Sequence, residues 1–163
     1  MHTVKLLIYG VIFMLFFTTA GLAAGVGDVS PAFNIKTLGG AEFDSETLKN
    51  QNAMILVFWA TWCPNCKREI PVLNQIHNNY QSKGLSVLAI NVGVNDSILR
   101  TDKYRRKYGI SYPTAFDSSS AVTRKFKVHG TPTIIVVDKK GIIRYRSGTV
   151  PEDFDEHYKT LME

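Results

Sequence analysis

A continuous apolar stretch, residues 54–59, ends shortly before the only two cysteines of this 163-residue chain, Cys63 and Cys66. After Cys66, apolar residues recur as far as Tyr80 at the spacing of one helix face. The cysteines are therefore expected in the first turn of a helix that directly follows a buried strand. Cysteines three positions apart there can close a disulfide, and the helix N-terminus stabilises a thiolate. This arrangement predicts a pair that exchanges electrons with other disulfides.

Other uses of a Cys-x-x-Cys pair fit the chain less well. A zinc site needs further ligands, but there is no second cysteine pair and the four histidines are scattered. Covalent haem attachment requires a histidine directly after the second cysteine, where this chain has Lys67. A purely structural disulfide would constrain little of the unfolded chain, because its loop is so short. We therefore predict a redox-active pair, with no metal ligands and no cofactor.

The N-terminus is predicted to direct the chain across a membrane. Lys5 precedes an apolar run, residues 6–17, and small residues follow it. This pattern is typical of a signal peptide cleaved near residues 23–25, although the charge-free stretch after Lys5 is also long enough for an uncleaved anchor. We assign residues 1–25 to a signal peptide or N-terminal membrane anchor. Either one would place the remaining domain, residues 26–163, in the periplasm or another extracytoplasmic compartment.

The formal net charge of +5 bears on the possible partners. Basic residues cluster at 103–107 and 124–127, as is usual on solvated helix faces. No aromatic stacking platform interleaves with these charges, and an exported chain rarely meets nucleic acid, so we predict no nucleic-acid partner. An acidic partner or an anionic lipid surface stays open as an alternative.

The remaining pattern alternates short strands with helices. A hairpin is expected around Gly39 and Gly40. The other expected elements are strands at 54–59, 85–92, 110–116, 134–137 and 142–145, and helices at 66–83, 96–108, 121–128 and 151–161. This order implies one layered α/β domain with a central sheet.

Together these residues resemble the thioredoxin-like superfamily. The stretch Trp62-Cys63-Pro64-Asn65-Cys66 after a buried strand matches its active-site signature, and Pro71 matches the proline of its active-site helix. Thr131-Pro132, followed by a strand, matches the loop that carries its cis-proline. The N-terminal hairpin, Glu69 and the extra helix near 96–108 are similar to the TlpA/ResA-like branch of exported thiol–disulfide oxidoreductases. The resemblance implies a central mixed β-sheet flanked by helices, with an N-terminal β-hairpin and an inserted helix.

The resemblance also implies roles for individual residues. Cys63, at an exposed helix start, is expected to attack a substrate disulfide, and Cys66 to resolve the mixed disulfide. Trp62, Pro64, Thr131 and Pro132 are expected to bind the substrate. A cis bond before Pro132 would leave the backbone of Thr131 free to hydrogen-bond an extended chain. Trp59 is instead expected in the core.

Members of this branch commonly act as reductants in cytochrome c maturation or on other exported proteins. The implied partners are a protein disulfide, such as that of apocytochrome c, and a membrane thiol–disulfide electron donor. The protein is expected to act as a monomer.

One position departs from thioredoxin, which has a buried aspartate where this chain has Val57. A proton acceptor for Cys66 must then come from elsewhere. Glu69, one helical turn after Cys66, is the candidate. The alternative is that Glu69 is an ordinary solvated helix residue.

Other activities would use the same two cysteines. A thiol oxidase or isomerase would differ from a reductase only in reduction potential. A thiol peroxidase shares the fold but usually places its cysteine in a different loop. A copper-binding chaperone module would need a further ligand beside the two sulfurs, for which His129 is the only candidate.

Overall fold

Five strands form the central sheet of the computed structural model, which describes residues 24–163. Their order across the sheet is β5-β4-β3-β6-β7. The strands are β3 (Ala53–Trp59), β4 (Leu85–Asn91), β5 (Thr114–Phe116), β6 (Thr133–Val137) and β7 (Ile143–Ser147). β3, β4 and β5 pair in parallel, whereas β6 and β7 are antiparallel to their neighbours. The predicted α/β fold with a mixed sheet is confirmed.

The apolar composition of the two central strands explains their position. Every residue of β3 is buried, and so is every residue of β4 except Ser86. Strands that are apolar on both faces need covering on both faces, which is why they lie at the centre of a layered fold.

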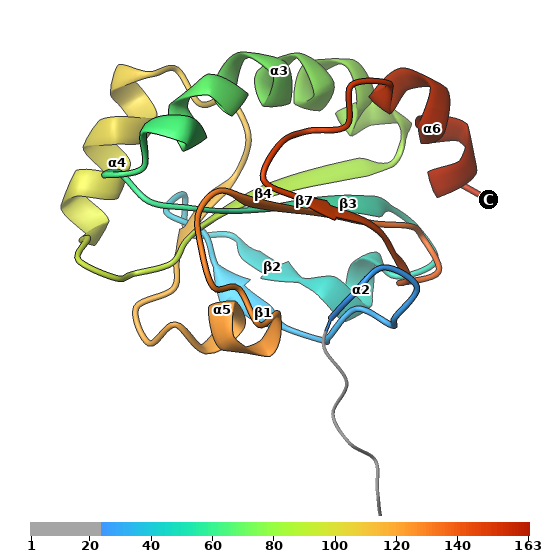
Figure 1. The fold of residues 1–163 in the computed structure, drawn as a ribbon, viewed down its shortest axis with the longest axis horizontal. Coiled ribbons are helices and arrows are strands. Elements are labelled where there is room, and N and C mark those ends of the chain that lie inside the picture. Colours follow the sequence, from blue (N-terminus) through green and yellow to red (C-terminus); the bar gives the residue numbers. More distant parts are fainter. Residues whose placement is uncertain (1–23) are drawn as a thin grey trace, which may run out of the picture.

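Helices and a hairpin cover the two faces of the sheet (Figure 1). α3 (Pro64–Tyr80), α4 (Ile98–Lys107) and α6 (Phe154–Leu161) lie on one side. The short helices α2 (Ser45–Leu48) and α5 (Ala121–Lys125) lie on the other, beside the hairpin of β1 (Asn34–Lys36) and β2 (Glu42–Asp44). A single turn of 3-10 helix, Gln81–Lys83, follows α3. The predicted hairpin and the predicted extra helix, which is α4, are both confirmed.

Four aromatic rings join the hairpin to the sheet. The ring centroid of Phe126, after α5, lies 5.5 Å from that of Phe33 and 5.4 Å from that of Phe58 in β3. Phe33 in turn stacks on Phe43 of β2 at 5.9 Å. All four side chains are buried, so the hairpin and the sheet share one hydrophobic core.

Two helices are shorter than their sequence patterns predicted. The helix expected at 121–128 ends at Lys125, because Lys127 has a positive φ of 47° that interrupts helical geometry. The helix expected at 151–161 begins only at Phe154. The helix expected at 96–108 is α4, which spans 98–107: the Ser97 hydroxyl accepts the amide of Arg100, and Gly109, with φ of 60°, follows its end.

The predicted signal peptide or anchor, residues 1–25, falls almost wholly in residues 1–23, outside the described part of the chain. Its two last residues are described: the carbonyl of Ala24 accepts a hydrogen bond from Arg146, and the amide of Gly25 donates to Asp28. Within residues 24–163, no helix is long and apolar enough to cross a membrane.

Candidate functional site

The two cysteines lie where the chain passes from β3 into α3. Cys63 is the N-cap of α3 and Cys66 lies in its first turn. A disulfide joins them, with 5.4 Å between their Cα atoms. The amide of Cys66 also donates to Cys63 Sγ at 3.2 Å, so the sulfur at the N-cap faces the unpaired amides of the helix. The predicted strand–turn–helix placement of the pair is confirmed.

The expectation that Cys63 is exposed is wrong for this disulfide-bonded form. Only 4% of Cys63 and 6% of Cys66 is accessible to solvent. The reason is that the Cys63 side chain turns back over the start of α3 to reach its partner sulfur. The neighbours Trp62 and Pro64 are exposed instead. In the disulfide form the two cysteines therefore differ in their position in α3, N-cap against first turn, and not in their exposure to solvent.

The two tryptophans around the motif have different environments, as expected. Trp59 is buried, and its ring centroid lies 5.3 Å from that of Tyr104 in α4. Trp62 is exposed, and its Nε1 donates to the carbonyl of Val94 at 2.8 Å. Trp62 is thus held beside the loop that joins β4 to α4.

The Thr131–Pro132 peptide bond is cis and directly precedes β6. In the pairing of β3 with β6, Thr133 lies opposite Phe58. Thr131 and Pro132 therefore lie at the end of the sheet where β3 runs into the cysteine motif. The loop and the cysteine motif thus lie at the same end of the sheet.

A small cavity of about 10 Å³ lies beneath the second cysteine. Cys66, Val57 and Trp59 line it, together with Tyr112 from the segment before β5. Burial raises the pKa of the Tyr112 hydroxyl, and the neighbouring Tyr104 and Glu69 raise it further. The sequence assigned Tyr112 no role, since no local pattern connects it with a cysteine far away in the chain.

Glu69 is not an ordinary solvated residue. It is half-buried, and its Oε2 accepts the amide of Val150 at 2.9 Å. Its charge also acts on the Tyr112 hydroxyl. The side chain therefore lies between the loop after β7 and the residues around the Cys66 cavity.

Asp96 organises the loop on the other side of the motif. Its side chain has no exposed surface and accepts hydrogen bonds from the amide of Thr61 at 2.8 Å, Asn91 Nδ2 at 2.8 Å and the amide of Ser97 at 2.9 Å. Burial alone would raise the pKa of Asp96, but these hydrogen bonds outweigh it and lower the pKa below its ordinary value. Sequence reasoning missed Asp96, whose partner Thr61 lies in a different loop.

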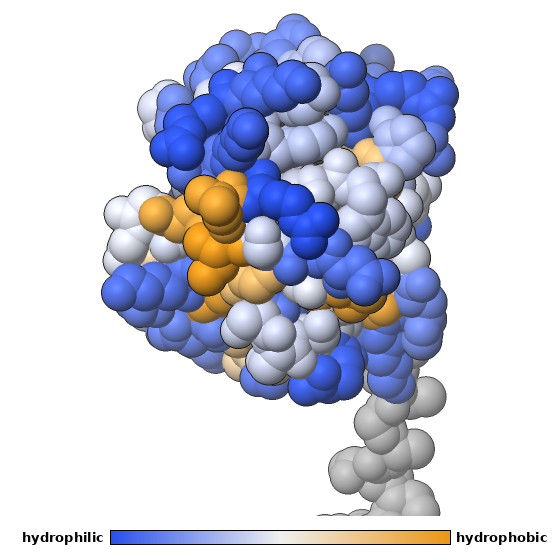
Figure 2. Space-filling model, turned by 90° about the vertical axis from the view of Figure 1, so that its left-hand side faces the viewer, coloured by the Kyte–Doolittle hydropathy of each residue, from blue (hydrophilic) through white to orange (hydrophobic). Residues whose placement is uncertain are grey.

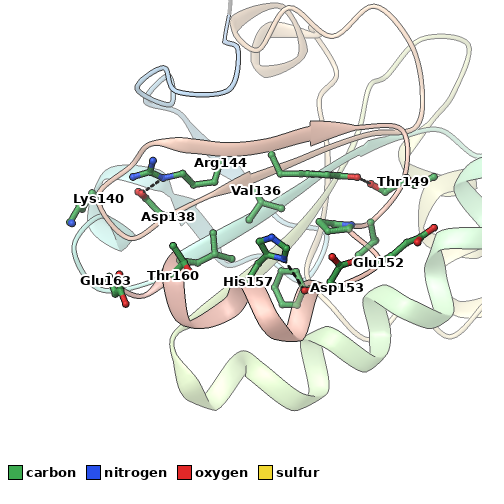
Figure 3. Close-up of a pocket in the computed structure, with 15 residues that line it drawn as sticks. Val136, Asp138, Lys140, Arg144, Thr149, Glu152, Asp153, His157, Thr160 and Glu163 are labelled. Atoms are coloured by element: carbon green, nitrogen blue, oxygen red, sulfur yellow. Dashed lines mark hydrogen bonds and ion pairs between the residues drawn. The ribbon is translucent and has the colours of Figure 1, made fainter.

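A wide pocket of about 720 Å³ lies elsewhere, between α6 and the strands β6 and β7 (Figure 3). Neither cysteine lines it. Among its lining residues, Arg144 pairs with Asp138 at 2.6 Å, and the His157 ring contacts the carbonyl of Asp153 at 3.0 Å. Val150, whose amide donates to Glu69, also lines this pocket.

His129, the candidate copper ligand, is exposed. Among residues 24–163, no three histidine, cysteine, aspartate or glutamate side chains gather as metal ligands would.

Comparison with known proteins agrees with this geometry. Residues 26–146 match the model of the AhpC/TSA family. The thiol-disulfide oxidoreductase ResA of Geobacillus thermodenitrificans strain NG80-2 is 31% identical over 147 residues, which cover 89% of this chain and 83% of that protein. The protein of the same name from Bacillus subtilis strain 168 is 27% identical over 138 residues, covering 84% and 75%.

Solved structures share the fold. The crystal structure of a thiol:disulfide interchange protein of the thioredoxin family from Chlorobium tepidum TLS superposes with a TM-score of 0.69. Its sequence is 29% identical, and the match covers 84% of this chain and 97% of that chain.

Proposed function

The chain belongs to the AhpC/TSA family, and on this premise we propose that it reduces disulfides of exported proteins through Cys63 and Cys66. It is a thiol–disulfide oxidoreductase with a thioredoxin-like fold, like the relatives that cover most of its length. The observation that carries the proposal is the disulfide at the start of α3, with the sulfur of Cys63 at the N-cap.

The reaction begins with the reduced pair. The Cys63 thiolate attacks one sulfur of the substrate disulfide, that disulfide breaks, and the second substrate sulfur leaves as a thiolate that takes up a proton. The Cys66 thiol then loses its proton and attacks Cys63 in the mixed disulfide, which releases the first substrate sulfur as a second thiol. The substrate gains two electrons and two protons, and the protein is left with the Cys63–Cys66 disulfide.

The surrounding residues suit these steps. The amide of Cys66 and the N-terminus of α3 stabilise negative charge on Cys63. Trp62 and Pro64 present exposed surface next to it, and the backbone of Thr131 before Pro132 would bind an extended substrate chain. Glu69, near the cavity that Cys66 and Tyr112 share, would accept the proton that Cys66 loses.

The cellular setting is inferred from the N-terminal sequence. Lys5, the apolar run after it and the small residues up to Gly25 support export, with the domain acting as a monomer in the periplasm or another extracytoplasmic compartment. A membrane thiol–disulfide donor would then return Cys63 and Cys66 to the reduced state. Apocytochrome c, with its own Cys-x-x-Cys pair, is the substrate class that we favour.

Trapping of the mixed disulfide tests this proposal. In Cys66→Ser, no thiol resolves the mixed disulfide formed at Cys63, so the variant should accumulate covalent complexes with exported proteins. Dithiothreitol should reduce these complexes and separate the two proteins. The matched control, Cys63→Ser, should trap few or none. Complexes formed through Cys66 instead would contradict the assigned order of attack.

The reduction potential tests the direction of electron flow. A reductase should equilibrate with glutathione or dithiothreitol at a potential nearer to about −270 mV, as in thioredoxin, than to about −120 mV, as in a strong oxidant. A value at the oxidising end would contradict the reductase and support the oxidase alternative.

A further inference from the structure

An apolar surface extends from the active-site motif onto α4. It consists of Trp62, Val94, Ile98 and Leu99, which are 52%, 51%, 57% and 74% exposed. We call these four residues the α4 patch. Figure 2, which faces the side of the molecule where α4 lies, shows apolar side chains gathered on this surface. Exposed apolar residues are common singly, but a group of them beside a reactive disulfide indicates an interaction surface.

Hydrogen bonds hold the α4 patch in place. Trp62 Nε1 donates to the carbonyl of Val94 at 2.8 Å, which joins the motif to the β4–α4 loop. The buried carboxylate of Asp96 binds the amides of both Thr61 and Ser97, so the residue before Trp62 and the residue before α4 share one anchor. The patch is therefore ordered before any partner binds, which lowers the entropic cost of binding.

The helix that carries much of the α4 patch is basic. Arg100 and Lys103 are exposed on α4, and Arg100 Nε lies 3.7 Å from Asp96 Oδ1. The one acidic residue within α4, Asp102, is occupied by ion pairs with Arg105 at 2.9 Å and Arg106 at 2.8 Å. An acidic partner would meet complementary charge here.

We propose that the α4 patch docks an extended, apolar segment of the substrate that carries the disulfide and is flanked by acidic residues. The patch is continuous with Trp62, next to the reacting Cys63, so a segment bound there places its own disulfide at the site. Folded proteins bury such segments, and the preferred substrates are therefore incompletely folded chains. This inference rests on the proposed function and specifies its substrate class.

Two synthetic peptides test the inference. Both contain the same intramolecular disulfide and terminal glutamates, but the residues flanking the cysteines are leucine and phenylalanine in one and serine in the other. We expect the reduced protein to act on the apolar peptide with a kcat/KM at least about tenfold higher than on the serine peptide, because each buried apolar side chain strengthens binding.

The variant Ile98→Ser/Leu99→Ser should lower kcat/KM for the apolar peptide about tenfold. Its values for the serine peptide and for hydroxyethyl disulfide should stay within about twofold. The matched control, Val26→Ser/Val29→Ser, changes two valines that are equally exposed in the N-terminal loop and should leave all three rates unchanged. A preference that persists in Ile98→Ser/Leu99→Ser overturns the docking surface. An equal loss of kcat/KM for all three disulfides in this variant would also overturn it. So would equal kcat/KM values of the unaltered protein for the apolar and the serine peptide.

A binding measurement separates docking from electron flow. The doubly redox-inactive Cys63→Ser/Cys66→Ser should bind the apolar peptide, with its cysteines alkylated, more than about tenfold more tightly than the serine peptide, as followed by tryptophan fluorescence. Replacing the terminal glutamates with lysines should weaken binding several-fold at low salt. Binding without subsequent reduction by the unaltered protein would contradict the reductase and support the docking surface. Equal binding of both peptides would overturn the docking surface whatever the activity.

Discussion

At the residue scale, the two cysteines differ in what surrounds their sulfurs. Cys63 Sγ lies at the N-cap and receives the amide of Cys66, which favours a negative sulfur. Cys66 lines a small apolar cavity with Val57 and Tyr112, which disfavours a negative sulfur. The first cysteine is thus suited to attack, and the second needs a nearby group to take its proton.

Neutralising Glu69 should make Cys66 easier to ionise. A negative charge about one helical turn away opposes a second negative charge on the sulfur, so Glu69→Gln should lower the midpoint of the pH profile of Cys66 alkylation by roughly one pH unit. Iodoacetamide labelling in the Cys63→Ser background measures this midpoint at Cys66 alone. Gln can still accept the amide of Val150, so a purely structural role of Glu69 would leave the midpoint unchanged. Glu46→Gln, on the exposed helix α2, is the matched control.

At the element scale, α4 and the loop before it depend on Asp96. The carboxylate connects the end of β4, through Asn91, with the motif at Thr61 and the start of α4 at Ser97. Asn91 also donates to Thr101 within α4 at 3.0 Å. One buried carboxylate therefore joins three segments: the end of β4, the motif that follows β3, and the start of α4.

Asp96→Asn should destabilise the protein in a pH-dependent way. The pKa of Asp96 is lowered in the folded state from an ordinary value of 3.8, so the ionised side chain stabilises the fold above that pH. We expect the variant to lose about 2 kcal/mol of unfolding free energy at pH 7, as for hydrogen bonds to a charged group. The difference in unfolding free energy from the unaltered protein should shrink as the pH falls below about 3.8 and then through the lower pKa that Asp96 has in the folded state.

Urea unfolding at pH 7 and at pH 3 measures that difference. The control Asp102→Asn removes partly exposed ion pairs on α4 and should cost less than about 1 kcal/mol. A loss in Asp96→Asn that is the same at both pH values would contradict the charge-based explanation.

At the scale of the whole molecule, aromatic packing joins the N-terminal hairpin to the central sheet. Phe126 is completely buried and lies against Phe33 and Phe58, one in the N-terminal segment and the other in β3. The N-terminal hairpin is too short to be stable by itself, so it depends on this contact. Folding of the hairpin and of the sheet should therefore be one cooperative process.

Phe126→Ala should lower the free energy of unfolding by about 3–5 kcal/mol, because it leaves a cavity between hairpin and sheet. Chemical denaturation followed by tryptophan fluorescence measures the change at Trp59 and Trp62. The control Val26→Ala alters an exposed residue and should change stability by less than about 0.5 kcal/mol. A small loss in Phe126→Ala would show that the hairpin does not share the core of the sheet.

The features that could be predicted from the sequence are those that depend on neighbours along the chain. The apolar run of β3, the cysteine pair at the start of α3, and the proline before β6 follow from local periodicity and backbone chemistry. Together with the family resemblance that they carry, these features were sufficient to predict the fold and the position of Trp59 in the core.

Which distant groups surround the sulfurs of Cys63 and Cys66 depends on how the elements pack together. The contact of Asp96 with Thr61, that of Glu69 with Val150, and the place of Tyr112 beside Cys66 each join residues from separate elements. The tertiary structure also decided that Cys63 is covered in the disulfide form. No local spacing encodes such contacts, because they arise when the sheet order brings the ends of different strands and helices together.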